Sequence, residues 1–215
     1  MPPLRDKLEA QRRTMSDEVR HAYEAAVAEL RGGGLTAGVL AVGDRFPDAM
    51  LPNAEGDLVA IADLLRDGPL VVTFFRGIWC PYCRVMLGAL VGALPAIEAA
   101  GARLAGVTPE TGGLALRTKR DHGAAFEVLS DVDCGLGLSC GVVFRTPDIY
   151  RGLMLKYGTD LAPRHGNDAW FLPLPVVFVL DRDGIVRWRF VSADFTEQAE
   201  PDGILAALRA LPAPG

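Results

Sequence analysis

Two cysteines separated by two residues are the strongest chemical signal in the sequence. Cys80 and Cys83 end the stretch Phe-Phe-Arg-Gly-Ile-Trp-Cys-Pro-Tyr-Cys, which joins an apolar run to a helical pattern. Cysteines at positions i and i+3 of a first helical turn share a face and come close enough to form a disulfide. Unpaired N–H groups and the positive end of the macrodipole favour a thiolate there. The pair therefore predicts dithiol–disulfide redox chemistry.

Three neighbours of the pair could support this chemistry. Pro81 suits a first helical turn, because its missing N–H costs no hydrogen bond there. Arg76 could bring a positive charge beside a sulfur, and the alternative is an ordinary surface ion pair. Trp79 directly precedes the first cysteine, as an aromatic residue in the expected active site.

Two further cysteines, Cys134 and Cys140, allow other interpretations. They could form a second redox pair, or they could be small buried side chains. They could also complete a zinc site with the first pair, but their six-residue spacing differs from that of a zinc knuckle and no histidine is near. We expect no metal. No glycine-rich phosphate-binding pattern is present, so we expect no nucleotide cofactor either.

The elements that must position the pair alternate between strand and helix. Apolar runs predict strands at 58–61, 70–75, 103–108, 126–129, 176–180 and 186–191, and helical periodicity falls at 83–100, 114–121, 149–156 and 204–211. Nearly all-apolar strands are typical of a sheet with helices on both faces. Asp-Arg-Asp-Gly at 181–184 predicts a hairpin. These patterns indicate an α/β domain over residues 41–215, with a mixed central sheet flanked by helices.

Residues 1–34 predict a helical extension. Apolar side chains recur there at spacings of three, four and seven, and Ser16 followed by two acidic residues could start a second helix. Three glycines, 32–34, end this unit. The extension could pack on its own domain, or it could reach a second subunit and so make a homodimer.

Composition excludes several classes of protein. The chain has 215 residues, half of them hydrophobic, which fits one compact domain with an appendage. A net charge of −5 argues against nucleic acid as a partner. No leader pattern is visible at the N-terminus, and no apolar run approaches the roughly 20 residues that a membrane span needs. Four cysteines without an export signal fit a reducing compartment, so we expect a cytoplasmic protein with no membrane partner.

The frame around the pair also resembles a known family. Together with Gly43-Asp44, Phe46-Pro47 and the stretch Leu-Pro-Leu-Pro at 172–175, it is similar to the peroxiredoxin-like branch of the alkyl hydroperoxide reductase and thiol-specific antioxidant family, over about residues 41–211. The resemblance implies a thioredoxin fold and an antioxidant peroxidase. It also implies a hydroperoxide substrate and a thiol reductant such as thioredoxin, glutaredoxin or glutathione.

The resemblance leaves the order of the two sulfurs open. The peroxiredoxin pattern puts Cys83 at the peroxide-attacking position, with Cys80 where a threonine is usual and Arg76 where a proline is usual. The family's active-site arginine falls at or near Pro175, so two of the usual peroxide-holding groups are missing. Similarity to thioredoxin and glutaredoxin instead makes Cys80 the attacking thiol. Pro175 then resembles the cis-proline that faces the disulfide, with an ordinary trans proline as the alternative.

Three hypotheses follow. The first is a thiol peroxidase that reduces hydroperoxides through a Cys80–Cys83 dithiol–disulfide cycle. The second is a thiol-disulfide oxidoreductase in which Cys80 attacks a disulfide substrate. The third is a non-catalytic thioredoxin-fold module that binds zinc or a partner through its cysteines.

Overall fold

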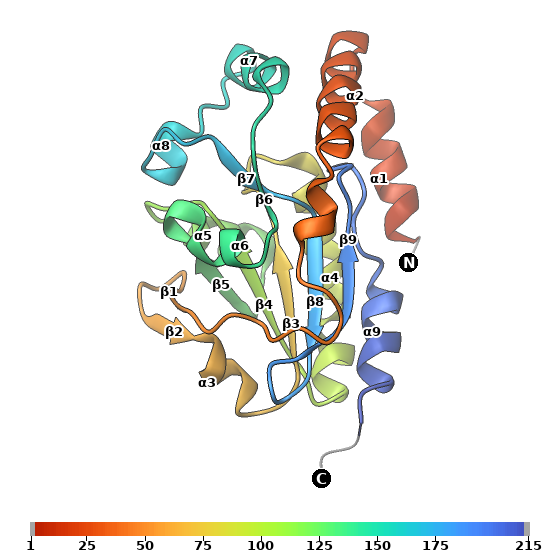
Figure 1. Cartoon of the computed structure of the whole chain (residues 1–215), viewed down its shortest axis with the longest axis vertical. Helices are drawn as coiled ribbons and strands as arrows, with labels where there is room; N and C mark the ends of the chain where they lie inside the picture. The colour runs from red at the N-terminus through yellow and green to blue at the C-terminus, as the bar shows by residue number, and fades with distance from the viewer. Residues whose placement is uncertain (1–2, 213–215) are drawn as a thin grey trace.

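A five-stranded mixed sheet forms the centre of the molecule (Figure 1). The structure, a computed structural model, describes residues 3–212. The strand order is β5-β4-β3-β8-β9, in which β3, β4 and β5 are parallel and β8 and β9 are antiparallel to their neighbours. The bounds are β3 Leu70–Phe74, β4 Arg103–Thr108, β5 Glu127–Ser130, β8 Val176–Leu180 and β9 Val186–Val191. The α/β fold predicted from the alternating patterns is confirmed.

Strand side chains alternate between two hydrophobic cores, one on each face of the sheet. Val72 and Phe74 enter one core, whereas Val71 enters the other, as the two-residue period of a strand requires. Burial on both faces explains why β3 and β8 are apolar throughout. The helices of the second core include α4 (Pro81–Ala99), α5 (Leu114–His122) and α9 (Pro201–Arg209). By length and composition α4 could also span a membrane, but here it packs against the sheet.

Several short elements lie outside the central sheet, among them the predicted helix at 149–156, which forms as α7, and others that were not predicted. The strand expected at 58–61 forms as β2 (Leu58–Ala60), but it pairs with β1 (Met50–Pro52) in a separate two-stranded sheet. A second small sheet joins β6 (Val143–Arg145) to β7 (Phe171–Pro173). The remaining elements of this side are η1 Leu35–Gly38, α3 Ile61–Leu65, η2 Val132–Cys134, α6 Gly135–Ser139, α7 Asp148–Lys156 and α8 Ala162–His165.

The N-terminal extension is a pair of helices, α1 (Leu4–Arg13) and α2 (Asp17–Gly32). Ser16 caps α2, with its hydroxyl accepting the Val19 N–H at 3.4 Å, so the break falls where the sequence predicts it. The extension packs on its own chain: α1 lies against α4 and α2 against α7 (Figure 1). The outermost residues of the two predicted units, 1–2 and 213–215, lie outside the described residues.

Candidate active site

The dithiol lies where β3 ends and α4 begins. Cys80 is the N-cap residue of α4, and its Sγ accepts the Cys83 backbone N–H at 3.2 Å. Pro81 occupies the first helical turn, as its lack of an N–H allows. Both thiols are free, and their residues are 0% and 2% exposed. The two cysteines are thus brought together in a site closed to bulk solvent.

Arg76 is the cation of this site. It is 2% exposed, and its Nη2 donates to Cys80 Sγ at 3.1 Å. Within residues 3–212 it forms no ion pair with a carboxylate, so the surface ion pair considered for it is wrong. A buried guanidinium needs an opposite charge nearby, and the sulfur of Cys80 is placed to supply it.

The two thiols differ in acidity. Burial raises the pKa of Cys80, but a hydrogen bond from the Cys83 side chain and the charge of Arg76 outweigh it and lower that pKa to about 6. Burial raises the pKa of Cys83 well above its usual value, and the neighbouring Cys80 sulfur raises it further. At neutral pH the site therefore holds a thiolate on Cys80 and a thiol on Cys83.

Aromatic rings and one hydroxyl hold the guanidinium in place. Arg76 Nη1 donates to the Tyr150 hydroxyl oxygen at 2.9 Å, and Tyr150 in turn donates to the Tyr23 hydroxyl oxygen at 3.3 Å. The guanidinium carbon lies 4.5 Å from the ring centre of Phe195 and 5.3 Å from that of Trp79. Cation–π attraction is strongest in such desolvated settings.

A buried carboxyl group fixes the loop between Arg76 and Cys80. Glu110 follows β4 and is fully buried, and its Oε2 accepts the Ile78 N–H at 2.8 Å. Its Oε1 lies 3.4 Å from Arg164 Nη1. Burial raises the pKa of Glu110. Gly77 has φ +139°, and a Cβ there would lie 2.5 Å from the Glu110 carboxyl carbon, so only glycine fits.

The second pair of cysteines is placed differently. Cys134 and Cys140 flank α6, and both are buried. Burial raises the pKa of Cys134 to about 12 and also raises that of Cys140, so both remain thiols at neutral pH. In the described part of the chain, no three His, Cys, Asp or Glu side chains gather in a way that could hold a metal.

Pro175 departs from the expected cis-proline. It directly precedes β8, beside the end of β3, because Phe74 and Val176 are partners in the antiparallel register. No peptide bond in the described residues is cis. The preceding Leu174 N–H bonds to Val142, and the Pro175 carbonyl accepts the Ser192 N–H. The Leu174–Pro175 peptide bond is therefore trans, the form that X–Pro bonds usually adopt in folded proteins.

Sequence reasoning missed four residues of this site. Tyr23, Tyr150 and Phe195 lie far apart in the chain, and no motif or spacing links them to the two cysteines. Glu110 belongs to the turn after β4, whose position at the carboxyl end of a strand was the one signal that pointed toward the site.

Comparisons with known proteins assign the family. A family model described as the AhpC/TSA family matches residues 42–189. The chain belongs to the AhpC/TSA family. It is accordingly a peroxiredoxin-like thiol peroxidase with a thioredoxin fold. Comparison with curated protein sequences finds no match.

Solved structures with the same fold include other peroxiredoxins. Peroxidoxin BcpB of Mycobacterium tuberculosis superposes with a TM-score of 0.62 at 21% identity, covering 80% of this chain and 98% of that one. Reduced Prx3 of Vibrio vulnificus, in complex with H2O2, gives a TM-score of 0.64 at 18% identity, covering 79% and 99%. The reduced 2-Cys peroxiredoxin of Plasmodium vivax gives 0.59 at 18% identity, covering 79% and 80%. These neighbours share the mixed sheet and its flanking helices with this AhpC/TSA chain.

Proposed function

We propose that this peroxidase reduces hydroperoxides through a Cys80–Cys83 disulfide and that Cys80 is the sulfur that attacks. The 3.1 Å contact between Arg76 Nη2 and Cys80 Sγ carries the proposal. Together with the hydrogen bond from the Cys83 side chain, this contact makes Cys80 the thiolate of the pair, with a pKa of about 6, and the thiolate is the nucleophilic form. This order differs from the peroxiredoxin alignment, in which Cys83 attacks.

The reaction balances in three steps. The Cys80 thiolate attacks the terminal oxygen of the hydroperoxide, the O–O bond breaks, and the alkoxide takes a proton from solvent and leaves as an alcohol, or as water from H2O2. The Cys83 thiol then attacks the Cys80 sulfenic acid, forming the disulfide and releasing water. Two equivalents of an external thiol, from thioredoxin, glutaredoxin or glutathione, reduce the disulfide by exchange.

Burial favours a hydroperoxide over a protein disulfide as the substrate. Because Cys80 is 0% exposed in the reduced form, a small hydroperoxide reaches its sulfur through a smaller opening of the site than a protein disulfide requires. Reduction of the Cys80–Cys83 disulfide by a protein thiol needs the larger opening. A peroxide is small enough to reach a buried sulfur after modest motions. Reduction by thiols also fits the reducing cytoplasm, which we propose as the location of this chain.

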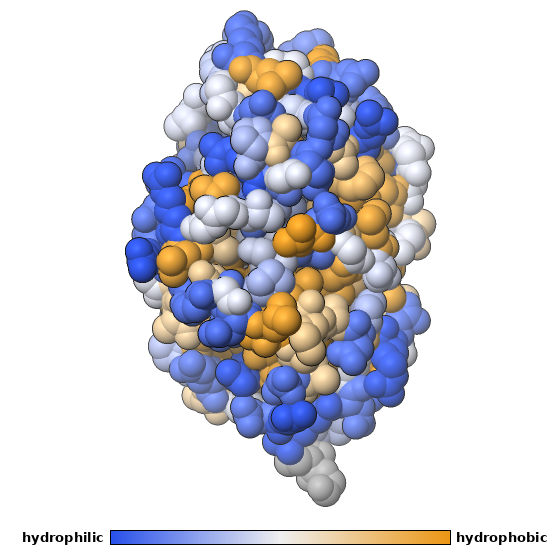
Figure 2. Space-filling model, turned by 90° about the vertical axis from the view of Figure 1, so that its left-hand side faces the viewer, coloured by the Kyte–Doolittle hydropathy of each residue, from blue (hydrophilic) through white to orange (hydrophobic). Residues whose placement is uncertain are grey.

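We also propose that the chain forms a homodimer. Large apolar side chains are exposed on the β1–β2 sheet, where Met50 is 61% and Leu58 67% exposed. The β1–β2 sheet lies on the left-hand side of Figure 1, and Figure 2 shows that side as a mixture of hydrophobic and hydrophilic surface. Light scattering that gives the mass of two chains, and one chain for Met50→Lys combined with Leu58→Lys, would support this assembly. A monomeric wild type would exclude it.

Trapping the sulfenic acid tests the order of the sulfurs. Reduced protein is treated with one equivalent of H2O2 and a dimedone-type probe, and mass spectrometry locates the label in the Cys80→Ser and Cys83→Ser variants. We expect fast labelling at Cys80 when Cys83 is absent and slow labelling at Cys83 when Cys80 is absent. The reverse pattern would assign the attack to Cys83. No labelling in either variant, with fast reduction of a disulfide by the wild type, would favour the thiol-disulfide oxidoreductase.

A further inference from the structure

We infer that Tyr150, and through it Tyr23 of the N-terminal extension, are positioning residues that hold Arg76 against the Cys80 sulfur. The inference rests on the proposed role of Cys80 as the attacking thiolate. Helix α2 then contributes a residue to the active site, although α2 lies outside the segment that matches the family model.

The direction of the hydrogen bonds supports this role. An arginine can only donate, so the Tyr150 oxygen must accept from Arg76 Nη1 at 2.9 Å. The Tyr150 hydroxyl hydrogen is then free for Tyr23, whose oxygen lies 3.3 Å away. Arg76 thus has one donor on the Cys80 sulfur and another on the tyrosine pair. Fixing Nη1 restrains the planar guanidinium and therefore also Nη2.

Ring packing fixes the two tyrosines. The Tyr23 ring stands edge-on to Tyr150, with ring centres 5.1 Å apart, and edge-on to Phe195, at 4.8 Å. Phe195 is stacked on Tyr150 at 5.0 Å, and the Arg76 guanidinium carbon lies 4.5 Å from the Phe195 ring centre. Both ring arrangements are favourable ones for aromatic pairs. One cluster therefore joins α2, α7 and the turn after β9 around a single cation.

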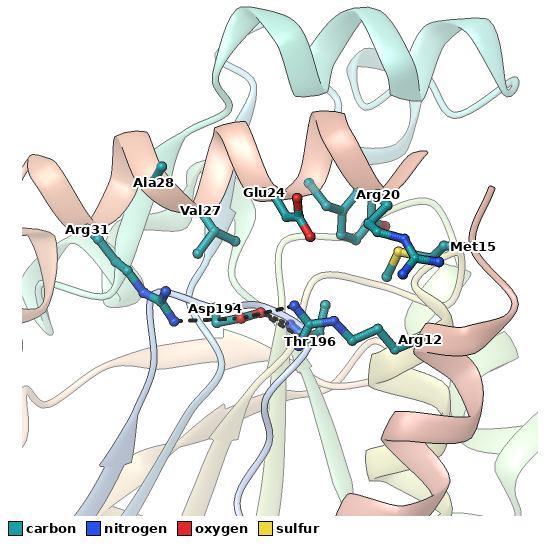
Figure 3. Close-up of a pocket in the computed structure, with 10 residues that line it drawn as sticks. Arg12, Met15, Arg20, Glu24, Val27, Ala28, Arg31, Asp194 and Thr196 are labelled. Carbon is teal, nitrogen blue, oxygen red and sulfur yellow. Dashed lines mark hydrogen bonds and ion pairs between the residues drawn. The ribbon is translucent and has the colours of Figure 1, made fainter. Parts of the chain in front are cut away.

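Ion pairs hold the extension against this cluster. Arg12 of α1 and Arg31 of α2 approach the same Asp194 oxygen, at 4.0 and 3.6 Å (Figure 3). Asp194 is nearly buried, accepts the Thr196 N–H at 3.0 Å, and precedes Phe195 in the chain. Both helices of the extension are thus tied to the turn whose ring lies against Arg76.

Removing single hydroxyl groups tests the inference, because Tyr→Phe keeps each ring. The pKa of Cys80 is measured from thiolate absorbance near 240 nm in wild type, Tyr150→Phe and Tyr23→Phe. We expect the pKa to rise in both variants, more in Tyr150→Phe. A rise of one unit, from about 6, lowers the thiolate fraction at pH 6 about fivefold, and the rate with H2O2 at that pH should fall equally. At pH 9 the rates should converge.

Tyr157→Phe is the matched control. Tyr157 also reaches the extension, through Glu18 at 3.4 Å, but it is exposed and has no contact with Arg76 in the described structure. Its removal should leave the pKa unchanged. Wild-type acidity in a folded Tyr150→Phe variant would overturn the inference. If instead wild-type Cys80 itself titrates near 9, or Arg76→Met leaves its pKa unchanged, the proposed function fails first.

Discussion

Arg76 Nη2 lies 3.1 Å from Cys80 Sγ, and both residues are buried away from solvent. The contact joins two residues four positions apart, across the loop between a buried strand and the first turn of α4. Its strength comes from the absence of water, because charges attract more strongly in a low dielectric. The pKa of Cys80 is the observable that reports it.

The rate of peroxide reduction should follow the ionisation of Cys80. Because the thiolate reacts and its pKa is about 6, the second-order rate constant with H2O2 should rise through pH 6 and level off above pH 7. Stopped-flow measurement of the first oxidation gives this profile. Cys83→Ser keeps a hydrogen-bond donor at position 83 and should keep a rising profile for that step. A midpoint near 9 in the wild type would contradict it.

Replacing Arg76 should raise the pKa of Cys80. Arg76→Met keeps an apolar side chain of similar length but no charge, and we expect the pKa of Cys80 to rise by about 1–3 units. Arg76→Lys keeps the charge without the planar fork and should give an intermediate value. Thiolate absorbance measures both. Equal values for the methionine and lysine variants would show that the charge has no part in the effect.

The stability of the reduced protein should depend on pH through Cys80. Its folded pKa, about 6, lies below the ordinary value of 9.0. Between pH 6 and pH 9, Cys80 therefore carries a proton in the unfolded chain and has lost it in the folded chain. This contribution to the free energy of unfolding is complete above pH 9 and is lost as pH falls toward 6, at a limiting slope of about 1.4 kcal/mol per pH unit. Urea unfolding across pH 6–9 measures it, and Cys80→Ala should lack this component.

Gly77→Ala should strongly destabilise the fold. The new Cβ would lie 2.5 Å from the Glu110 carboxyl carbon, and φ +139° is strained for any residue with a side chain. We expect a loss of about 2–4 kcal/mol in chemical denaturation. In the double variant Gly77→Ala, Glu110→Ala the clash is gone, but the backbone strain at position 77 remains. The losses of unfolding free energy of the two single variants should therefore sum to more than the loss in the double variant. Strict additivity would show that the clash is relieved elsewhere.

The second cysteine pair should be dispensable for turnover. Cys134 and Cys140 are buried thiols with raised pKa values. Cys134→Ala combined with Cys140→Ala should leave the rate of hydroperoxide reduction unchanged and lower the melting temperature by the lost packing. Steady-state kinetics with a thiol reductant tests this. A fall in turnover without a fall in the first oxidation rate would instead give the pair a role in resolving the disulfide.

Much of the framework followed from local patterns. The apolar runs of β3, β4 and β8 were predictable because strands buried on both faces allow few polar residues. The Cys80–Cys83 turn was predictable because the helix start is set by proline and by the cysteine spacing. Short strands such as β1 and β6 carry no such pattern, and three residues are too few to show a period.

The surroundings of Arg76 could not be predicted in the same way. The residues that meet there, Tyr23, Tyr150 and Phe195, come from segments far apart in the chain. Their proximity depends on how α2 and α7 pack over the sheet, which no spacing encodes. Burial also changes what Arg76 does: on a surface its charge would be screened by solvent, but here it helps to lower the pKa of the Cys80 thiol.

The buried guanidinium of Arg76 also affects the reduction potential of the Cys80–Cys83 disulfide. When Cys80 and Cys83 join in a disulfide, the Cys80 thiolate is lost, whereas Arg76, which donates to that sulfur in the reduced form, remains a cation. The oxidised form therefore holds a buried cation without its counter-ion, whereas the reduced form is stabilised by the pair. A dithiol stabilised in this way gives an oxidising disulfide. We therefore expect this disulfide to be reduced more readily than one without Arg76 beside it, so that a weaker thiol reductant can return the enzyme to its reduced form.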